Sequence, residues 1–332
     1  MQGHGTTRRR LRSDHDTTAI LVACIYAGHR QKLLSTATRY RTDSLAYQRP
    51  TAKGEGPMSD SAVATEGFVE VNGARLWYET AGSGPTLVMV HGHLIDSGQW
   101  DSQFAEFAQG FRVVRYDARG FGRSDKPAAP FAFHEDLRAV LASLDIPPAF
   151  FIGCSGGGAT VIDLALAYPD SVLGLVLVGS AVSGYAFSGP QPPKIVAMRE
   201  ARERGNIDDA VELGLQLWTD GERRRPEQVD PVAREHTRQM MTRQLSRPAV
   251  AAEAWTLDPP AISRLADIRV PTLVVVGADD SALIHDIAEL LTGQITGARK
   301  VVIPDAGHHP NMEHPAAFNE MVLSFLKLIP AS

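Results

Sequence analysis

The stretch that most constrains the fold of this chain is Gly153-Cys154-Ser155-Gly156-Gly157, which fits the pattern G-x-S-x-G. A short apolar run at 149–152 precedes it, and residues 159–168, apolar at helical spacing, follow it. These flanks predict a strand, a sharp turn and a helix, in that order. Such a turn holds a serine hydroxyl clear of a sheet and beside backbone N–H groups that can receive an oxyanion. Ser155 is therefore a candidate nucleophile.

The serine pattern alone is equally compatible with a helix N-terminus that Ser155 caps, so the downstream segments decide between the two interpretations. Residues 271–277 read as a buried parallel strand and lead to Asp280. Residues 299–304 read as another strand and lead to His308. Because the carboxyl ends of parallel strands meet at one edge of a sheet, we expect Ser155, Asp280 and His308 to lie together there.

Further motifs occur in the order typical of one fold. They are His91-Gly92 after an apolar strand, a D-x-R-G-x-G-x-S loop at 117–124, G-x-x-D at 277–280, and the spacing of His308, Glu313 and Pro315. On these motifs the chain, over about residues 65–330, resembles the α/β-hydrolase fold superfamily, in particular enol-lactone hydrolases and esterases with a helical cap. The resemblance implies an α/β fold with a mostly parallel eight-stranded sheet flanked by helices and an inserted cap.

The chemistry of such a site assigns a role to each residue. Ser155 Oγ would attack an acyl carbon, and His308 would take its proton and later give it to the leaving group. Asp280 would fix the imidazole tautomer and stabilise the imidazolium. The oxyanion would be met by the backbone N–H of Gly156 and, by resemblance to the loop that follows His-Gly in this family, by that of His93.

Neighbouring residues offer alternatives to some of these choices. Asp279 adjoins Asp280 and could be the acid, but the family spacing from Gly277 favours Asp280. His309 adjoins His308 and is expected at a pocket wall or on the surface. Among the other polar residues of the motifs, Asp117 and Arg119 are expected to lock their loop, and Glu313 to tether a loop or cap the last helix.

The histidines of the first motif raise the question of a metal. His91 and His93 lie two residues apart, but no third ligand with supporting spacing appears, so loop hydrogen bonding is the preferred interpretation. We expect no metal and no cofactor. The serine also argues against haloalkane dehalogenases and epoxide hydrolases, which use aspartate at this position of the fold. Gly156, often bulkier in relatives, indicates either room beside the nucleophile or a loose first helical turn.

Residues 183–260 interrupt the strand–helix alternation and are predicted to form a helical cap, inserted between core segments 65–182 and 261–330. Its helices are expected at 194–204, 208–218 and 232–245. Met and Trp side chains in the cap could shape an apolar, adaptable pocket. The charged run 222–227 is interpreted as a solvated turn rather than an anion site.

The N-terminal segment differs in composition from the rest. Residues 1–57 hold ten Lys or Arg against four Asp or Glu, whereas the whole chain has a net charge of −5. We expect residues 1–60 to be a disordered or non-native extension, with Met58 as a possible true start. An export signal is a weaker interpretation, because Asp14 and Asp16 interrupt its basic and apolar parts.

Composition favours one globular unit in a reducing compartment. The chain of 332 residues is 44% hydrophobic and has no apolar run near 18 residues, so we expect no membrane span. The net charge of −5 gives no footprint for nucleic acid. Its two cysteines, Cys24 and Cys154, lie far apart in unlike contexts, which suits the cytoplasm better than a disulfide framework.

Together these features predict a serine hydrolase that cleaves a small-molecule carboxylic ester or lactone, with an apolar acyl part, through an acyl-enzyme. Two related chemistries resemble this chain in fold and triad: carbon–carbon bond hydrolysis of a vinylogous diketone and cofactor-free perhydrolysis. A different class, a ligand-binding receptor that retains the triad, also remains open. A serine-directed probe together with an ester panel would separate them.

Overall fold

The computed structural model describes residues 64–185, 192–248 and 254–330. The predicted N-terminal extension, 1–60, and Cys24 lie outside the described residues. None of the helices in these three ranges is both long enough and apolar enough to cross a membrane.

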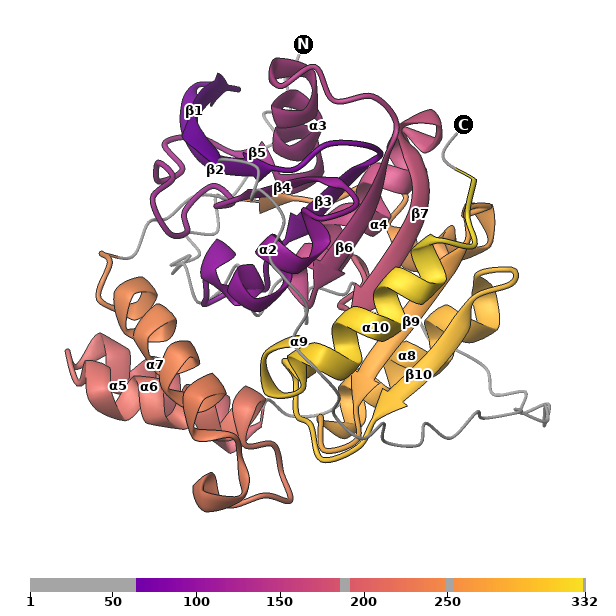
Figure 1. The fold of residues 1–332 in the computed structure, drawn as a ribbon. Helices are drawn as coiled ribbons and strands as arrows, with labels where there is room; N and C mark the ends of the chain where they lie inside the picture. The colour runs from indigo at the N-terminus through magenta and orange to yellow at the C-terminus, as the bar shows by residue number, and fades with distance from the viewer. Residues whose placement is uncertain (1–63, 186–191, 249–253, 331–332) are drawn as a thin grey trace, which may run out of the picture.

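An eight-stranded sheet runs through the centre of the molecule in the order β1-β2-β4-β3-β6-β7-β9-β10 (Figure 1). The β1–β2 and β2–β4 pairs are antiparallel, and all other neighbours are parallel. The predicted mostly parallel, eight-stranded α/β fold is therefore confirmed. Its strands are β1 Thr65–Val71, β2 Ala74–Ala81, β3 Thr86–Val90, β4 Arg112–Tyr116, β6 Ala149–Cys154, β7 Val172–Val178, β9 Thr272–Gly277 and β10 Arg299–Ile303.

The first two strands form a hairpin with a two-residue turn. Asn72 and Gly73 both have positive φ, 49° and 76°. This conformation matches the right-handed twist of hairpin strands and favours Asn-Gly, which explains the sequence at this turn.

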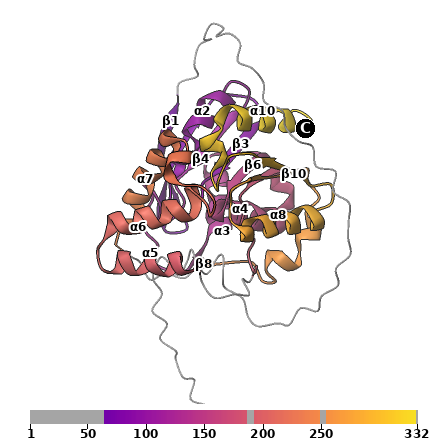
Figure 2. The ribbon, with the colours of Figure 1, turned by 90° about the horizontal axis from the view of Figure 1, so that it is seen from below.

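The central strands are buried on both faces, because helices cover each side of the sheet. In β3, Val88 and Val90 pack into the core on one face, whereas Leu87 and Met89 pack into the core on the other. Helices α3, α4 and α8 cover the first face, and α2 and α10 the second (Figure 2). Their bounds are α2 Asp101–Phe107, α3 Phe133–Ser143, α4 Gly156–Ala167, α8 Ala282–Gln294 and α10 Pro315–Leu326.

Short helical turns connect these elements. They are η1 Ser97–Trp100, η2 Pro169–Ser171, η5 Ala261–Ser263, η6 Leu265–Asp267 and α9 Pro310–Glu313.

Residues 193–245, called the helical insertion below, lie between β7 and β9 and stand apart from the sheet (Figure 1). They form α5 Pro193–Glu203, α6 Ile207–Gly214, the π-helical turn η3 Leu215–Thr219, η4 Pro226–Gln228 and α7 Pro231–Leu245. After the insertion, β8 Ala254–Trp255 pairs in parallel with β5 Phe131–Ala132. The insertion has its own apolar cluster, which Leu94 and Ile95 of the loop after β3 join.

Candidate active site

Ser155 lies at the sharp turn between β6 and α4. Its φ of 52° and ψ of −117° place a non-glycine residue in a sparsely populated region of backbone space. Two hydrogen bonds hold this conformation: the Ser155 N–H donates to the Val178 carbonyl (2.9 Å), and the Ser155 carbonyl accepts from the Ala181 N–H (3.0 Å). A Cβ on Gly153 would come within 2.6 Å of the Gly157 carbonyl oxygen, so only glycine fits where strand and helix cross.

The loops after β9 and β10 bring Asp280 and His308 together. Asp280 Oδ2 lies 2.7 Å from His308 Nδ1, and both side chains are buried. Asp280 Oδ1 accepts a hydrogen bond from the Ser281 N–H (2.7 Å). The carboxylate favours a proton on Nδ1, which leaves Nε2 as the acceptor. The carboxylate of the alternative acid, Asp279, instead lies 3.3 Å from the guanidinium of Arg223.

One loop, at residues 178–181 after β7, contacts both Ser155 and His308. Its residues make the two hydrogen bonds to the Ser155 backbone. A Cβ built on Gly179, in the middle of the loop, would lie 3.0 Å from His308 Nδ1. The loop thus lies against both residues. The serine, the imidazole and the carboxylate lie at the same edge of the sheet.

The loop after β3 presents backbone N–H groups beside the serine. The Gly92 N–H donates to Gln99 Oε1 (2.9 Å) and is therefore occupied. Among the described residues, the N–H groups of His93 and Gly156 have no such acceptor. His91 is held in one tautomer: its Nε2 accepts from the Ala118 N–H (3.0 Å), so its Nδ1 donates to the Gly92 carbonyl (2.7 Å).

The imidazole of His93 packs in an aromatic cluster. It stacks on Phe121 with ring centroids 5.2 Å apart and meets Phe133 at 5.1 Å. Removal from solvent and, as the smaller cause, the neighbouring His91 together lower the pKa of the partly buried His93 to about 3. The His93 ring is consequently neutral near pH 7. No three potential metal-binding side chains gather among the residues that the structure describes.

Asp117 and Arg119 hold their loop in place, in the manner expected from sequence. Asp117 accepts hydrogen bonds from the N–H groups of Ser97 (2.9 Å) and Arg123 (2.7 Å). Arg119 makes a two-pronged ion pair with Asp136, at 2.6 and 2.8 Å. Neither side chain contacts Ser155 or His308.

The prediction of a solvated turn at 222–227 is wrong for Arg224, whose side chain is buried, although its charged neighbours are exposed. The Arg224 side chain is only 7% exposed, and its Nη1 lies 2.6 Å from Oε2 of Glu313, whose side chain is 2% exposed. Arg224 also donates to the Thr219 and Asp305 carbonyls. Glu313 accepts from the Gly307 N–H (2.7 Å), so this ion pair joins the helical insertion to the loop that carries His308.

His309 is buried, which excludes the surface position that was one of its two expected places. Its ring meets His308 edge-on, with centroids 5.2 Å apart. Burial and the neighbouring His308 hold the pKa of His309 well below its usual value, so the ring is neutral.

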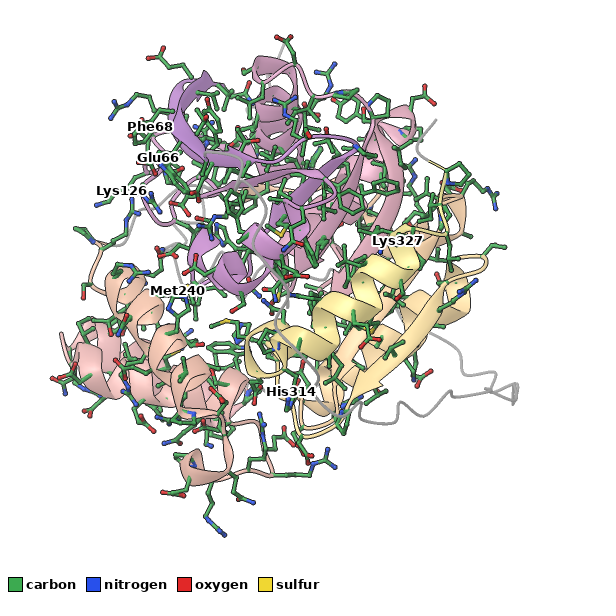
Figure 3. The ribbon with its side chains drawn as sticks, viewed as in Figure 1. Glu66, Phe68, Lys126, Met240, His314 and Lys327 are labelled. Carbon is green, nitrogen blue, oxygen red and sulfur yellow. The ribbon has the colours of Figure 1, made fainter. Side chains whose placement is uncertain are left out.

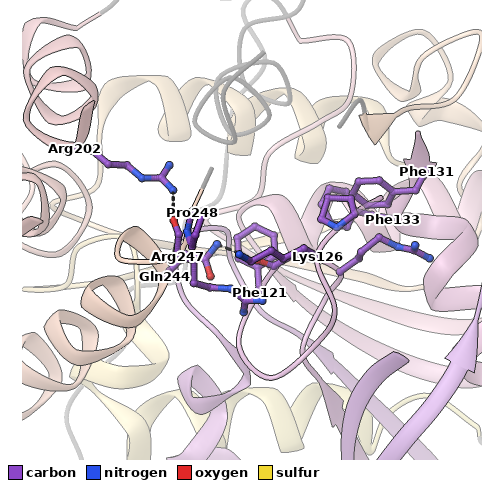
Figure 4. A pocket seen from close by; sticks show the side chains of 11 residues that line it. Phe121, Lys126, Phe131, Phe133, Arg202, Gln244, Arg247 and Pro248 are labelled. Atoms are coloured by element: carbon purple, nitrogen blue, oxygen red, sulfur yellow. Dashed lines mark hydrogen bonds between the residues drawn. The ribbon is translucent and has the colours of Figure 1, made fainter. Parts of the chain in front are cut away.

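Two pockets flank the aromatic cluster of His93. The first, about 400 Å³ in volume, has Phe121, Phe131 and Phe133 as its aromatic side and lies against α7 of the insertion (Figure 4). The second, about 350 Å³, runs along α4 from Gly156 to Asp163 and is bordered by Phe133 and Trp255. Met240, labelled in Figure 3, lies on the side of α7 that faces the core, with its Sδ close to Gly98.

Comparison with known proteins gives relatives of several activities. The chain is 27% identical over 295 residues to a 2-hydroxy-6-oxo-6-phenylhexa-2,4-dienoate hydrolase of Burkholderia cepacia, a match that spans 80% of this chain and 98% of that protein. It is 30% identical over 261 residues to a pimeloyl-[acyl-carrier protein] methyl ester esterase of Pectobacterium carotovorum, which spans 76% of this chain and 98% of that protein.

Solved structures similar to this chain include two lactone-cleaving enzymes. The enol-lactonase of Burkholderia xenovorans superposes with a TM-score of 0.64 at 27% identity and covers 79% of this chain and all of its own. An N-acyl homoserine lactone degrading enzyme superposes with a TM-score of 0.63 at 29% identity. It covers 78% of this chain and all of its own. The family model of the alpha/beta hydrolase fold matches residues 85–315, and with the serine turn, sheet and His308 loop described above, the chain belongs to the alpha/beta hydrolase fold family.

Proposed function

We propose that the protein is a serine hydrolase that cleaves a carboxylic ester or lactone through an acyl-enzyme. The observation that carries the proposal is the buried hydrogen bond between Asp280 and His308, together with a serine in a strained turn at the same edge of the sheet. A carboxylate on Nδ1 leaves Nε2 to take the proton of a serine hydroxyl. The comparisons assign the chain to a hydrolase family, and a small-molecule substrate is consistent with that family. Ester specificity and the roles of single residues are the new part of the proposal.

The proposed reaction has two halves. Ser155 Oγ attacks the carbonyl carbon while His308 Nε2 takes its proton, and the N–H groups of His93 and Gly156 donate to the oxyanion. The bond between the carbonyl carbon and the leaving oxygen then breaks as His308 gives its proton to that oxygen, which leaves an alcohol and an acyl-Ser155 ester. A water molecule, deprotonated by His308, attacks this ester; the bond to Ser155 Oγ breaks, His308 returns the proton to Oγ, and the acid is released.

An apolar acyl group fits the surroundings of the serine. The cluster of His93, Phe121 and Phe133 offers uncharged aromatic surface beside Gly156. The segment 183–260 would act as a cap over this surface, with α7 as its nearest helix. An esterase and two lactone-cleaving enzymes among the relatives and solved structures support ester chemistry.

A fluorophosphonate probe tests the proposal. We expect it to label Ser155 in the wild-type protein, the labelling to disappear in Ser155→Ala, and p-nitrophenyl acetate or butyrate to be hydrolysed with an initial burst. Intact labelling without turnover on a panel of esters and lactones would contradict the ester proposal and favour a ligand-binding receptor.

Carbon–carbon bond hydrolysis is the second candidate, because relatives at 27% and 26% identity carry 2-hydroxy-6-oxo-dienoate hydrolase names. The same serine, histidine and aspartate would serve such a reaction. Product analysis on a ring-fission diketone distinguishes the two, since the carbon–carbon reading requires cleavage of the diketone at a rate that exceeds ester turnover.

We place the enzyme in the cytoplasm. The thiol of Cys154 is free and buried, which suits a reducing compartment. Fractionation of cells that express the full chain tests this placement, and recovery of the protein in an extracellular or periplasmic fraction would contradict it.

A further inference from the structure

The position after the nucleophile has no side chain, and another residue fills the space. A Cβ built on Gly156 would lie 2.6 Å from three atoms of the His93 imidazole. Real Cβ atoms do not approach other atoms so closely, so the His93 ring occupies the place that a side chain at 156 would take. The two alternatives left open by the sequence are thereby resolved: Gly156 makes room, and the room holds an imidazole.

The His93 ring also contacts residues that line both pockets. Its stacking partner Phe121 and its neighbour Phe133 both line the first pocket. Phe133 and Gly156 both line the second. The ring thus contacts residues that line each pocket, at the position directly after Ser155.

The position of the ring relative to His308 indicates which half of a substrate it meets. A departing alcohol must lie beside His308 to receive the proton. His308 borders Gly179, on the side of the β7 loop, whereas His93 borders Gly156, on the side of the oxyanion N–H groups. With the alcohol held on the His308 side, the acyl chain is the half of the substrate that can reach the His93 ring.

We propose that the His93 imidazole is the specificity-determining residue of this enzyme, and that it limits the length of the acyl chain by closing the space that Gly156 leaves open. This inference rests on the proposed ester hydrolysis. The ring makes no hydrogen bond to any residue in the described ranges, so its orientation is fixed by packing on Phe121 and Phe133. Its lowered pKa keeps it uncharged, as an apolar acyl chain requires.

An acyl-length series tests the inference. With p-nitrophenyl esters from acetate to dodecanoate, the alcohol stays constant and only the acyl chain changes. We expect His93→Ala to raise the ratio of kcat/KM for long chains to that for acetate by about tenfold or more, because a pocket that gains several methylenes of space gains binding energy for each. The change should be seen mainly in KM for the long esters. His93→Phe keeps a planar ring and should keep the wild-type preference.

A reciprocal pair provides the control. Gly156→Ala should lower kcat/KM for all chain lengths, because its Cβ displaces the His93 ring and the loop that carries the His93 N–H. Adding His93→Ala removes the clash, so the double variant should regain about tenfold or more over Gly156→Ala alone. His93→Val, smaller than an imidazole, repeats the length test if His93→Ala does not fold.

The outcomes separate this inference from the proposal beneath it. An unchanged length preference in His93→Ala and His93→Val, with an active wild-type enzyme, overturns the role of His93 and leaves ester hydrolysis intact. Additive losses in the double variant overturn it as well. A wild-type protein that neither hydrolyses esters nor reacts with the fluorophosphonate overturns the proposed function and this inference together.

Discussion

Replacement of Asp163 by asparagine should change how the stability of the protein depends on pH. Asp163 lies on α4, two turns beyond Ser155, and is only 4% exposed. It accepts hydrogen bonds from the Ser183 hydroxyl (2.6 Å) and from the Leu257 backbone. Ser183 lies where the chain leaves β7 for the insertion, and Leu257 lies where it returns, so this carboxyl joins both connections.

Burial raises the pKa of Asp163 from 3.8 to about 7, although its hydrogen bonds from Ser183 and Leu257 act in the opposite direction. The folded protein thus holds a proton that the unfolded chain releases at lower pH. The free energy of unfolding contributed by Asp163 is therefore greatest below pH 4 and falls as the pH rises from about 4 to about 7. A difference of three pKa units corresponds to about 4 kcal/mol across that window.

Asparagine has the shape of the neutral acid and does not titrate, so Asp163→Asn should lose this slope. The free energy of unfolding of the variant minus that of the wild type should increase by about 4 kcal/mol between pH 4 and pH 8. Guanidinium unfolding at several pH values measures it. Ser183→Ala is the control, because loss of a hydrogen bond to the carboxylate should steepen the wild-type slope. Parallel stability curves for Asp163→Asn and wild type would refute the reasoning.

Three further predictions concern the site and its support. Asp280→Asn should lower kcat about 10⁴-fold, because it favours the wrong imidazole tautomer, whereas Asp279→Asn should change kcat little; equal losses in steady-state kinetics would contradict the assignment. Arg224→Met should cost about 3–5 kcal/mol in chemical unfolding by leaving the Glu313 carboxylate buried and unpaired, and Glu313→Gln added to it should restore part of that loss. Burial raises the pKa of the Cys154 thiol to about 12, so iodoacetamide should modify it only after unfolding, as peptide mass spectrometry can check.

Sequence reasoning predicted the sheet and the place of the serine well because both depend on local pattern. The β-branched run that forms β9 is buried along its whole length, and such a run indicates a parallel strand without knowledge of its partners. The turn at Ser155 follows from its glycines, since the backbone approaches there too closely for a Cβ.

Contacts between distant segments could not be read from local pattern. The run at 222–227 looks solvated because five of its six residues are charged, yet Arg224 pairs with Glu313, which is 89 positions away in the sequence. The filling of the space at Gly156 by His93 depends on how the β3 loop folds over α4, which no periodicity encodes. The glycine directly after the candidate nucleophile, at a position often bulkier in relatives, was the signal that could have raised the question.

The helical insertion is attached to the proposed machinery more closely than the word cap suggests. The His308 N–H donates to the Trp218 carbonyl of η3 (2.9 Å), so the insertion helps to position the imidazole through the main chain. A Cβ on Gly307 would come within 2.5 Å of the Thr219 carbonyl oxygen, which shows how closely the two segments pack. A swing of η3 away from the sheet would break both this hydrogen bond and the buried ion pair of Arg224. The insertion is also bound to the core around α7, where Gln244 donates to the Gly120 carbonyl (3.1 Å) and Arg243 pairs with Asp96 (2.8 Å), so any opening of the site must break polar contacts at both ends of the insertion.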